Sequence, residues 1–241
     1  MSSSVPAWKA RFGFQCISAV IQSAQTAKVP NHNTILELDR KVRDMELPKY
    51  AEQPPKQGAG LGEAMKHFMP RNYRHLSKPR SPSLLSKQLL SVLALLYIHR
   101  CFFAEAVSSN PTNPMKSPYA PSFLAGYRSA CELIGGLRTQ FDLFPAQIAR
   151  FWVLWTHAFS SSVSAASFTC LSRHHADTLH TQVMLSSVVT HASGSGARSK
   201  ITAASLTELR RAVDLFREAS AFGGRAEKFL VSICNGLPDS E

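Results

Sequence analysis

The chain has 241 residues, of which 44% are hydrophobic and 18% charged, so its length and composition fit one large domain with a sizeable hydrophobic core. The net charge of +11 reflects few acidic residues (16) more than many basic ones (27), and it favours contact with nucleic acid or acidic surfaces without indicating a fold. The five cysteines are odd in number and far apart, so neither a disulfide framework nor a zinc ribbon is indicated. We expect reduced, mostly buried thiols in a cytosolic or nuclear protein.

Two helices are predicted before residue 48. The first residues are polar and lack the apolar core of a signal peptide. Residues 7–28 then carry apolar side chains at helical spacing, namely Phe12, Cys16, Ile17, Val20 and Ile21. Residues 34–47 carry a second such stripe, made of Ile35, Leu38, Val42 and Met45. Asn33 or Thr34 is the predicted N-cap of this helix, and Pro48 ends it.

Residues 49–82 are rich in proline and glycine and are predicted to be a loop, with room for a short helix at residues 63–68. A basic patch with two aromatic residues lies in this loop and consists of Lys66, Phe68, Arg71, Tyr73, Arg74, Lys78 and Arg80. Two interpretations stay open, because the patch either contacts phosphate groups or is the solvated surface of a mobile loop.

A long apolar helix is predicted from residue 83 to residue 107, and two Asn-Pro steps at residues 110–114 end it. Its continuous apolar run, residues 89–98, is shorter than the ~20 residues that a membrane span needs. We therefore expect a buried core helix and no membrane contact. His99 and Arg100 close the run and are expected to cap the helix or to pair within the bundle, because a buried charge needs a partner.

Two more apolar helices are predicted between residues 121 and 163. The first begins at Pro121-Ser122, and Gly135-Gly136 within it are expected to allow close packing against a neighbour. Pro145 suits the first turn of the second, which is apolar nearly all round and is therefore expected at the centre of a bundle. We interpret His157 as a hydrogen-bonded core histidine and not as a catalytic base. The tryptophans are interpreted as core residues, namely Trp8, Trp152 and Trp155.

The clearest amphipathic helix spans residues 205–219, with Ser205 and Glu208 as a predicted capping box and Gly223-Gly224 at its end. A last short helix is predicted at residues 226–234. Alternating strand patterns are absent from the sequence, so the predicted fold class is all-α. The expected core residues are Phe123, Tyr127, Ile134, Phe151, Trp152, Trp155, Leu209, Val213 and Phe216.

Residues 163–182 interrupt the helical pattern. Without these 20 residues the apolar helix continues from Phe159 into the apolar run at residues 183–192, in helical register. The codons of Val163-Ser164 and Gln182 can match the two ends of a spliceosomal intron, so the segment is interpreted as a translated intron, with a natural loop insertion as the alternative. The Cys and His residues in and just after it lack a recognised ligand spacing, and no metal site is predicted from Cys170, His174, His175, His180 and His191.

Four short motifs occur in order along the chain: His99-Arg100-x-Phe102-Phe103-Ala104, Ser117-Pro118-Tyr119-Ala120-Pro121-Ser122, Tyr127-Arg128-Ser129-Ala130 and Arg150-Phe151-Trp152-x-x-Trp155-x-His157-Ala158-Phe159-Ser160. With the phrase at residues 35–43, they resemble the regulatory (middle homology) domain of fungal zinc-cluster transcription factors. The resemblance covers residues 8–48 and 83–235, on either side of the 49–82 loop and around the 163–182 segment. It implies a single all-helical array over residues 1–241, incomplete because the match opens in the middle of that domain.

The resemblance implies a nuclear regulator of RNA polymerase II transcription that acts through an effector or through contacts with transcription-machinery or other regulatory proteins. A homodimer is left open. The zinc cluster of that family needs six closely spaced cysteines, which this chain lacks. The chain is therefore expected to be a C-terminal fragment that holds no cofactor and no metal and that reaches DNA only through a missing zinc-cluster domain.

Two alternatives remain beside the hypothesis of a transcription regulator. The first is a stand-alone helical protein-interaction module that lacks DNA binding. The second is a helical enzyme, for which the sequence offers no phosphate-loop, dinucleotide-binding, nucleophile-elbow or metalloprotease motif. We therefore predict no enzymatic activity and name no catalytic or cofactor-binding residue.

Overall fold

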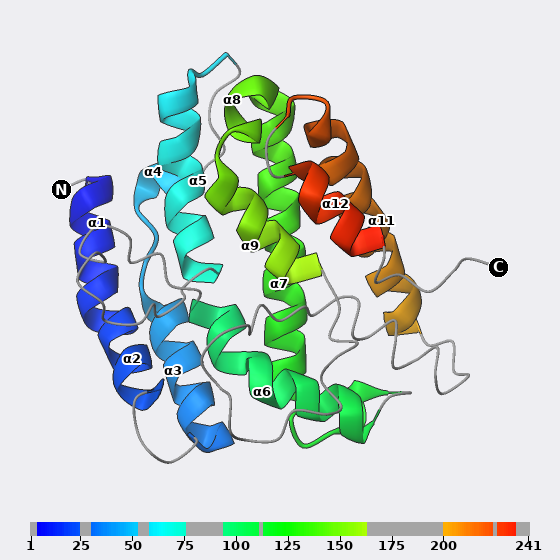
Figure 1. Ribbon diagram of the computed structural model, residues 1–241. Coiled ribbons are helices and arrows are strands. Elements are labelled where there is room, and N and C mark those ends of the chain that lie inside the picture. The colour runs from blue at the N-terminus through cyan, green and yellow to red at the C-terminus, as the bar shows by residue number, and fades with distance from the viewer. Residues whose placement is uncertain are drawn as a thin grey trace. The chain divides into compact units, whose positions relative to one another are not determined.

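The computed structural model describes residues 4–24, 30–52, 58–75, 94–110, 113–162, 200–223 and 226–234. Every regular element in these ranges is helical, which confirms the all-α fold class (Figure 1). The chain divides into two compact units, residues 1–99 and 100–241, and the boundary falls inside one helix, α6 (Ala94–Ser109). None of the helices in these ranges combines the length and the apolar character needed to cross a bilayer.

The first unit starts with one helical segment made of α1 (Val5–Phe12), the π-helical turn η1 (Gly13–Ile17) and α2 (Ser18–Ala24). It continues with α3 (His32–Asp44), α4 (Lys49–Glu52) and α5 (Leu61–His75). α3 contacts η1, while α5 contacts both α1 and α4. The helix predicted at residues 7–28 is thus present as far as residue 24, where the described range ends, and the one predicted at residues 34–47 ends at Asp44. Their buried stripes include Phe12, Cys16, Val20, Leu38 and Val42.

The predicted N-cap of α3 is wrong by two to three residues. The helix begins earlier, and Oδ1 of Asn31 accepts a hydrogen bond from the Thr34 N–H at 2.8 Å. Asn31 thereby satisfies a backbone donor that the first turn of a helix leaves without an internal partner.

The predicted loop at residues 49–82 is also wrong over much of its length, because α4 and α5 lie there. Ala64 and Phe68, one helical turn apart, are both buried, and their burial stabilises α5 although Pro70 lies inside it. The Arg71 guanidinium donates to the backbone oxygens of Ala51 and Glu52 at the end of α4, at 2.7 and 2.9 Å. Two members of the predicted basic patch, Phe68 and Arg71, therefore have structural roles.

The second unit contains the C-terminal part of α6, followed by η2 (Pro114–Lys116), α7 (Ala120–Leu143), α8 (Pro145–Ala149), α9 (Trp152–Ser162), α11 (Lys200–Ser220) and α12 (Ala226–Cys234). The long α7 contacts α8, α9 and α11, and α11 packs beside α12 (Figure 1). Trp155 is fully buried between Phe141 and Phe216, with ring centroids 5.7 and 5.3 Å apart. α6 ends at Ser109 and α11 at Ser220, within two residues of the predicted ends, and α12 lies at the predicted residues.

Two of the predicted core residues, Phe151 and Trp152, are each 45% exposed. The apolar helix predicted after Pro145 breaks at Arg150, so α8 and α9 are separate helices and Trp152 is the first residue of the second one. This corner moves both aromatic side chains out of the core. Tyr127 is partly buried, whereas the other members of the predicted core are buried, namely Phe123, Ile134, Trp155, Leu209, Val213 and Phe216.

A smaller prediction for the second unit also fails, and another fails at one of its two glycines. α11 begins at Lys200, so Ser205 lies inside the helix, fully buried, and is not an N-cap. Ala203 and Ala204 precede it and are strong helix formers, which extends the helix upstream. A Cβ placed on Gly135 would meet no atom within 4 Å, so this glycine does not mark a close helix–helix approach.

Some predictions concern residues outside the described ranges. They are the inserted segment at residues 163–182, the apolar run at residues 183–192 and the five cysteine and histidine residues of that region. The beginning of the helix predicted from residue 83 and the basic residues Lys78 and Arg80 lie outside them as well.

Candidate functional site

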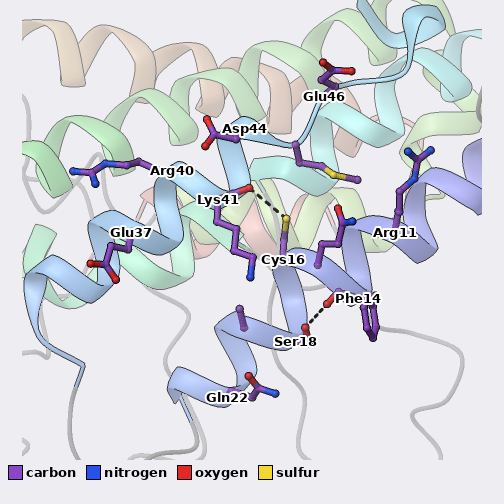
Figure 2. A pocket seen from close by; sticks show the side chains of 13 residues that line it. Arg11, Phe14, Cys16, Ser18, Gln22, Glu37, Arg40, Lys41, Asp44 and Glu46 are labelled. Carbon is purple, nitrogen blue, oxygen red and sulfur yellow. Dashed lines mark hydrogen bonds between the residues drawn. The ribbon is translucent and has the colours of Figure 1, made fainter.

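A groove of about 930 Å³ runs between the first helical segment and α3 (Figure 2). α1, η1 and α2 supply one side, and α3 with the two residues that follow it supplies the other. We call it the N-terminal groove. Its lining residues are Arg11, Phe14, Gln15, Cys16, Ser18, Ala19, Gln22, Glu37, Arg40, Lys41, Asp44, Met45 and Glu46.

The π-helical turn η1 follows from the spacing of the buried residues on the first side of the groove. Trp8, Phe12, Cys16 and Val20 are all buried and lie four positions apart. An α-helix turns about 100° per residue, so a stripe repeated every four residues drifts by about 40° at each step. In η1 the Ser18 N–H donates to the Gly13 oxygen, which gives a wider turn and keeps the stripe on the buried side.

The same turn carries Phe14 at the edge of the groove. Its side chain is 81% exposed, more than that of any other large hydrophobic residue in the described ranges. The Ser18 hydroxyl donates to the Phe14 backbone oxygen and so fixes the turn locally (Figure 2). π-turns occur frequently at functional sites, and an aromatic ring so exposed is available to a partner.

The other side of the groove is the polar face of α3. Ile35, Leu38 and Val42 are buried behind it, and the charged residues that α3 contributes to the groove are exposed. Hydrogen bonds join the two sides. The Cys16 thiol donates to the Lys41 backbone oxygen at 3.6 Å, and the Trp8 indole N–H donates to the Glu46 backbone oxygen at 2.8 Å. The groove is therefore held by buried side chains rather than by its own charged rim.

Charges of both signs line the groove. The cations are Arg11, Arg40 and Lys41, and the anions are Glu37, Asp44 and Glu46. Within the described ranges, the four charged side chains that α3 contributes form no ion pair with one another or with a neighbour. These charges are thus available to a ligand or a protein partner.

A histidine–carboxylate contact lies on α3 outside the groove. His99, fully buried, places Nε2 2.9 Å from Oδ1 of Asp39, and the Arg43 Nε donates to the other oxygen of that carboxylate at 2.7 Å. Burial alone would raise the pKa of Asp39, but the hydrogen bonds from His99 and Arg43 outweigh it and hold the pKa below its ordinary value. This confirms that His99 pairs within the helical array.

The electrostatic effect of this contact reaches His32 at the start of α3. The pKa of His32 is lowered mainly by burial and, to a smaller extent, by the nearby His99. Because His99 is fully buried, its ring does not face the groove, and the His99–Asp39 contact joins helices instead of binding a ligand.

A second hollow, of about 430 Å³, lies between α7 and α11 in the second unit. Its charged residues already pair with one another or with neighbours. Arg138 contacts Asp142 and Glu218, both at 2.8 Å, and Arg211 contacts Glu208 at 2.6 Å. Paired charges offer less to a ligand than free ones, so the N-terminal groove is the stronger candidate site.

Two titratable residues of α7 lie close to this second hollow. Burial raises the pKa of Tyr127 to about 12 and that of Cys131 to about 11, and the negative charge of Glu208 adds to both shifts. The Cys131 thiol is therefore protonated near neutral pH and is a poor nucleophile.

The structure does not bring the remaining chemically interesting residues into one site. In the ranges that it describes, no three His, Cys, Asp or Glu side chains are placed to hold a metal ion. His157 is partly buried on α9. The basic patch is not continuous, because Phe68 is buried and Arg71 binds backbone oxygens.

The N-terminal groove itself was not anticipated from the sequence. One signal for it was available, since Phe14 is an aromatic residue that falls off the buried stripe of Phe12 and Cys16. A large apolar side chain on the polar face of a predicted helix indicates either a contact surface or an error in the helical register.

A scan against protein-family models and searches among curated proteins and among solved structures gave no match for this chain.

Proposed function

We propose that this chain is the regulatory part of a transcription regulator of the fungal zinc-cluster type. It would control RNA polymerase II transcription in the nucleus through contacts with an effector or with regulatory proteins. The proposal assigns these contacts to the N-terminal groove. The observation that carries this assignment is Phe14, 81% exposed at the edge of a groove whose α3 charges have no partner within the described ranges.

The transcriptional part of the proposal is supported by how the resembling motifs pack. His99 of the first motif contacts Asp39 of the phrase at residues 35–43, at 2.9 Å. The aromatic residues that follow it contact the second motif and its neighbour, since Phe102 lies 5.0 Å from Tyr119 and Phe103 lies 5.1 Å from Phe123, ring centre to ring centre. Within each of the two units, residues that resemble one family thus pack against one another.

The zinc ions of that family's DNA-binding cluster do not fit this chain. A cluster of two metals needs six closely spaced cysteines, whereas Cys16, Cys101 and Cys131 are far apart in the sequence and Cys16 is buried. We therefore assign neither metal binding nor sequence-specific DNA binding to these residues.

A reporter assay tests the proposed function. Residues 1–241 are fused to a heterologous DNA-binding domain that has no transcriptional activity of its own, and the fusion is expressed in a fungal host with a reporter under its binding site. We expect reporter transcription to change severalfold, up or down, relative to the DNA-binding domain alone. An unchanged reporter at equal nuclear protein levels would overturn the transcriptional role and favour a stand-alone protein-interaction module.

A further inference from the structure

The two sides of the N-terminal groove differ in charge. α3 lines the groove with exposed side chains that form no ion pair within the described ranges, namely Glu37, Arg40, Lys41 and Asp44. The facing segment, η1 with α2, has no charged residue between Gly13 and Ala24. It lines the groove with neutral hydrogen-bonding side chains instead, which are Gln15, Ser18 and Gln22. The α3 charges therefore face a neutral polar wall at η1 and α2.

The order of the charges on α3 indicates the charge of a matching ligand. Glu37 and Lys41 are one helical turn apart, so their Cβ atoms are separated by roughly 5–6 Å. A ligand with only negative charge would be repelled by the carboxylate beside Lys41, and a ligand with only positive charge by the ammonium group beside Glu37. A nucleic acid or an acidic surface would need an excess of cations here. A small molecule that carries both charges close together meets neither difficulty.

Lys41 is placed to bind the negative end of such a molecule. Its side chain extends from α3 toward α2 (Figure 2), and its backbone oxygen accepts the hydrogen bond from the Cys16 thiol at 3.6 Å, which holds this turn of α3 against η1. The Lys41 ammonium group can donate to a carboxylate, while the Glu37 carboxylate can accept from an ammonium group. The amides of Gln15 and Gln22 offer further hydrogen bonds from the facing wall.

The groove also has room and an apolar surface for the rest of a small ligand. Its volume of about 930 Å³ lies within the roughly 300–1,000 Å³ found for small-molecule sites. Phe14, 81% exposed, lies at its edge, and Ala19 and Met45 are among its lining residues. An aromatic ring of this kind packs well against another ring.

We infer that the N-terminal groove binds a free α-amino acid with an aromatic side chain. Lys41 binds its carboxylate, Glu37 binds its ammonium group, and Phe14 packs against its ring. Because the proposed function assigns effector contacts to this groove, the ligand class rests on that proposal and specifies its effector.

Isothermal titration calorimetry of the full chain with four related probes tests the inference. Phenylalanine has both charges and a ring, phenethylamine lacks the carboxylate, hydrocinnamate lacks the ammonium group, and alanine lacks the ring. Phenylalanine is expected to bind at least about tenfold more tightly than each of the other three, because each of these loses one of the three contacts.

Two substitutions assign the two charged contacts separately. Lys41→Met should weaken phenylalanine binding by at least about tenfold but leave phenethylamine, which has no carboxylate, within about twofold of its wild-type affinity. Glu37→Gln should weaken phenylalanine binding similarly and leave hydrocinnamate unaffected. Lys66→Met is the matched control for the lysine, since Lys66 is exposed on α5 and does not line the groove. All three positions are exposed, so unchanged helical circular dichroism is expected.

Three results would overturn the inference: no binding of phenylalanine up to its solubility limit, hydrocinnamate or phenethylamine binding as tightly as phenylalanine, or a Lys41→Met variant with wild-type affinity for phenylalanine. The reporter assay separates this failure from that of the proposed function. Reporter output that depends on Phe14 in a chain that binds no amino acid would remove only the ligand class. Amino-acid binding with an unchanged reporter would remove only the transcriptional role.

Discussion

Nε2 of His99 lies 2.9 Å from Oδ1 of Asp39, which is 60 residues earlier in the chain. The contact connects α6 with α3, the helix that supplies one side of the N-terminal groove. His99 is fully buried, so the carboxylate satisfies a polar group that would otherwise have no access to water. The position of α3, and with it the groove, therefore depends on this pair.

Replacing Asp39 with alanine should lower the free energy of unfolding by about 2–4 kcal/mol, because the buried His99 ring loses its acceptor. Arg43→Ala removes the other partner of Asp39 but should cost less than about 1 kcal/mol, since the Arg43 side chain is 44% exposed. Urea denaturation of the two variants measures the difference. Equal costs for both would show that the His99 contact does not stabilise the fold.

Replacing each of the two tryptophans of α9 with alanine should lower the free energy of unfolding by very different amounts, although the two residues are one turn apart. Trp155 is fully buried and its indole N–H donates to the Ile148 oxygen at 2.9 Å, so Trp155→Ala should cost about 3–5 kcal/mol. Trp152 is 45% exposed, and Trp152→Ala should cost at most about half as much. Chemical denaturation of both variants gives the comparison, and similar losses would place Trp152 in the core after all.

The helices themselves were largely predictable from the sequence, because the apolar spacing in α3, α7 and α11 places their buried residues on one face. The errors arose where tertiary contacts override local signals. Pro70 indicated a break, but the burial of Ala64 and Phe68 stabilises α5 around it. Ser205 has the pattern of a cap and is instead buried within α11. Rules based on helix propensity and capping patterns do not include such tertiary packing.

The groove was less predictable than the fold. The π turn at Gly13–Ile17 lines one side of it, and no local rule used for the first helix includes a turn of this kind. The free charges on α3 were readable as an exposed helix face, but their position opposite α2 required the structure.

Stability should fall on acidification in two steps. The pKa values of His32 and His67 are lowered from 6.5, mainly by burial, so below that value the unfolded state binds more protons and folding loses free energy as the pH falls. The pKa of Asp39 is lowered from 3.8, so its contribution is complete above that value and is lost as the pH falls through the folded-state pKa.

Urea unfolding of the wild type at a series of pH values checks both steps. Asp39→Asn should reduce the loss of stability below pH 3.8 and leave the loss that begins near pH 6.5 unchanged. His32→Asn should reduce only the loss that begins near pH 6.5. A stability that rises as the pH falls from 6.5 would contradict the lowered pKa values of these two partly buried histidines.

The cysteines should differ in reactivity in the native state. Cys101 is exposed, Cys16 is buried, and the pKa of Cys131 is raised to about 11. Iodoacetamide at neutral pH should therefore modify Cys101 before Cys16 and Cys131, because only an accessible thiolate reacts. Peptide mapping by mass spectrometry reads each site separately, with urea-unfolded protein as the control in which all sites react. Rapid modification of Cys131 in the folded protein would contradict the environment described for it.

The reporter fusion with a single substitution in the groove tests the central claim most directly, because it joins the proposed site to the proposed activity. Phe14→Asp should return reporter transcription to the level of the DNA-binding domain alone, while Phe151→Asp, an equally drastic change of another exposed aromatic residue, should leave it within about twofold of the wild type. Both proteins are expected to be equally abundant, since neither side chain is in the core. Full reporter output from the Phe14→Asp variant would contradict the assignment of regulatory contacts to the N-terminal groove.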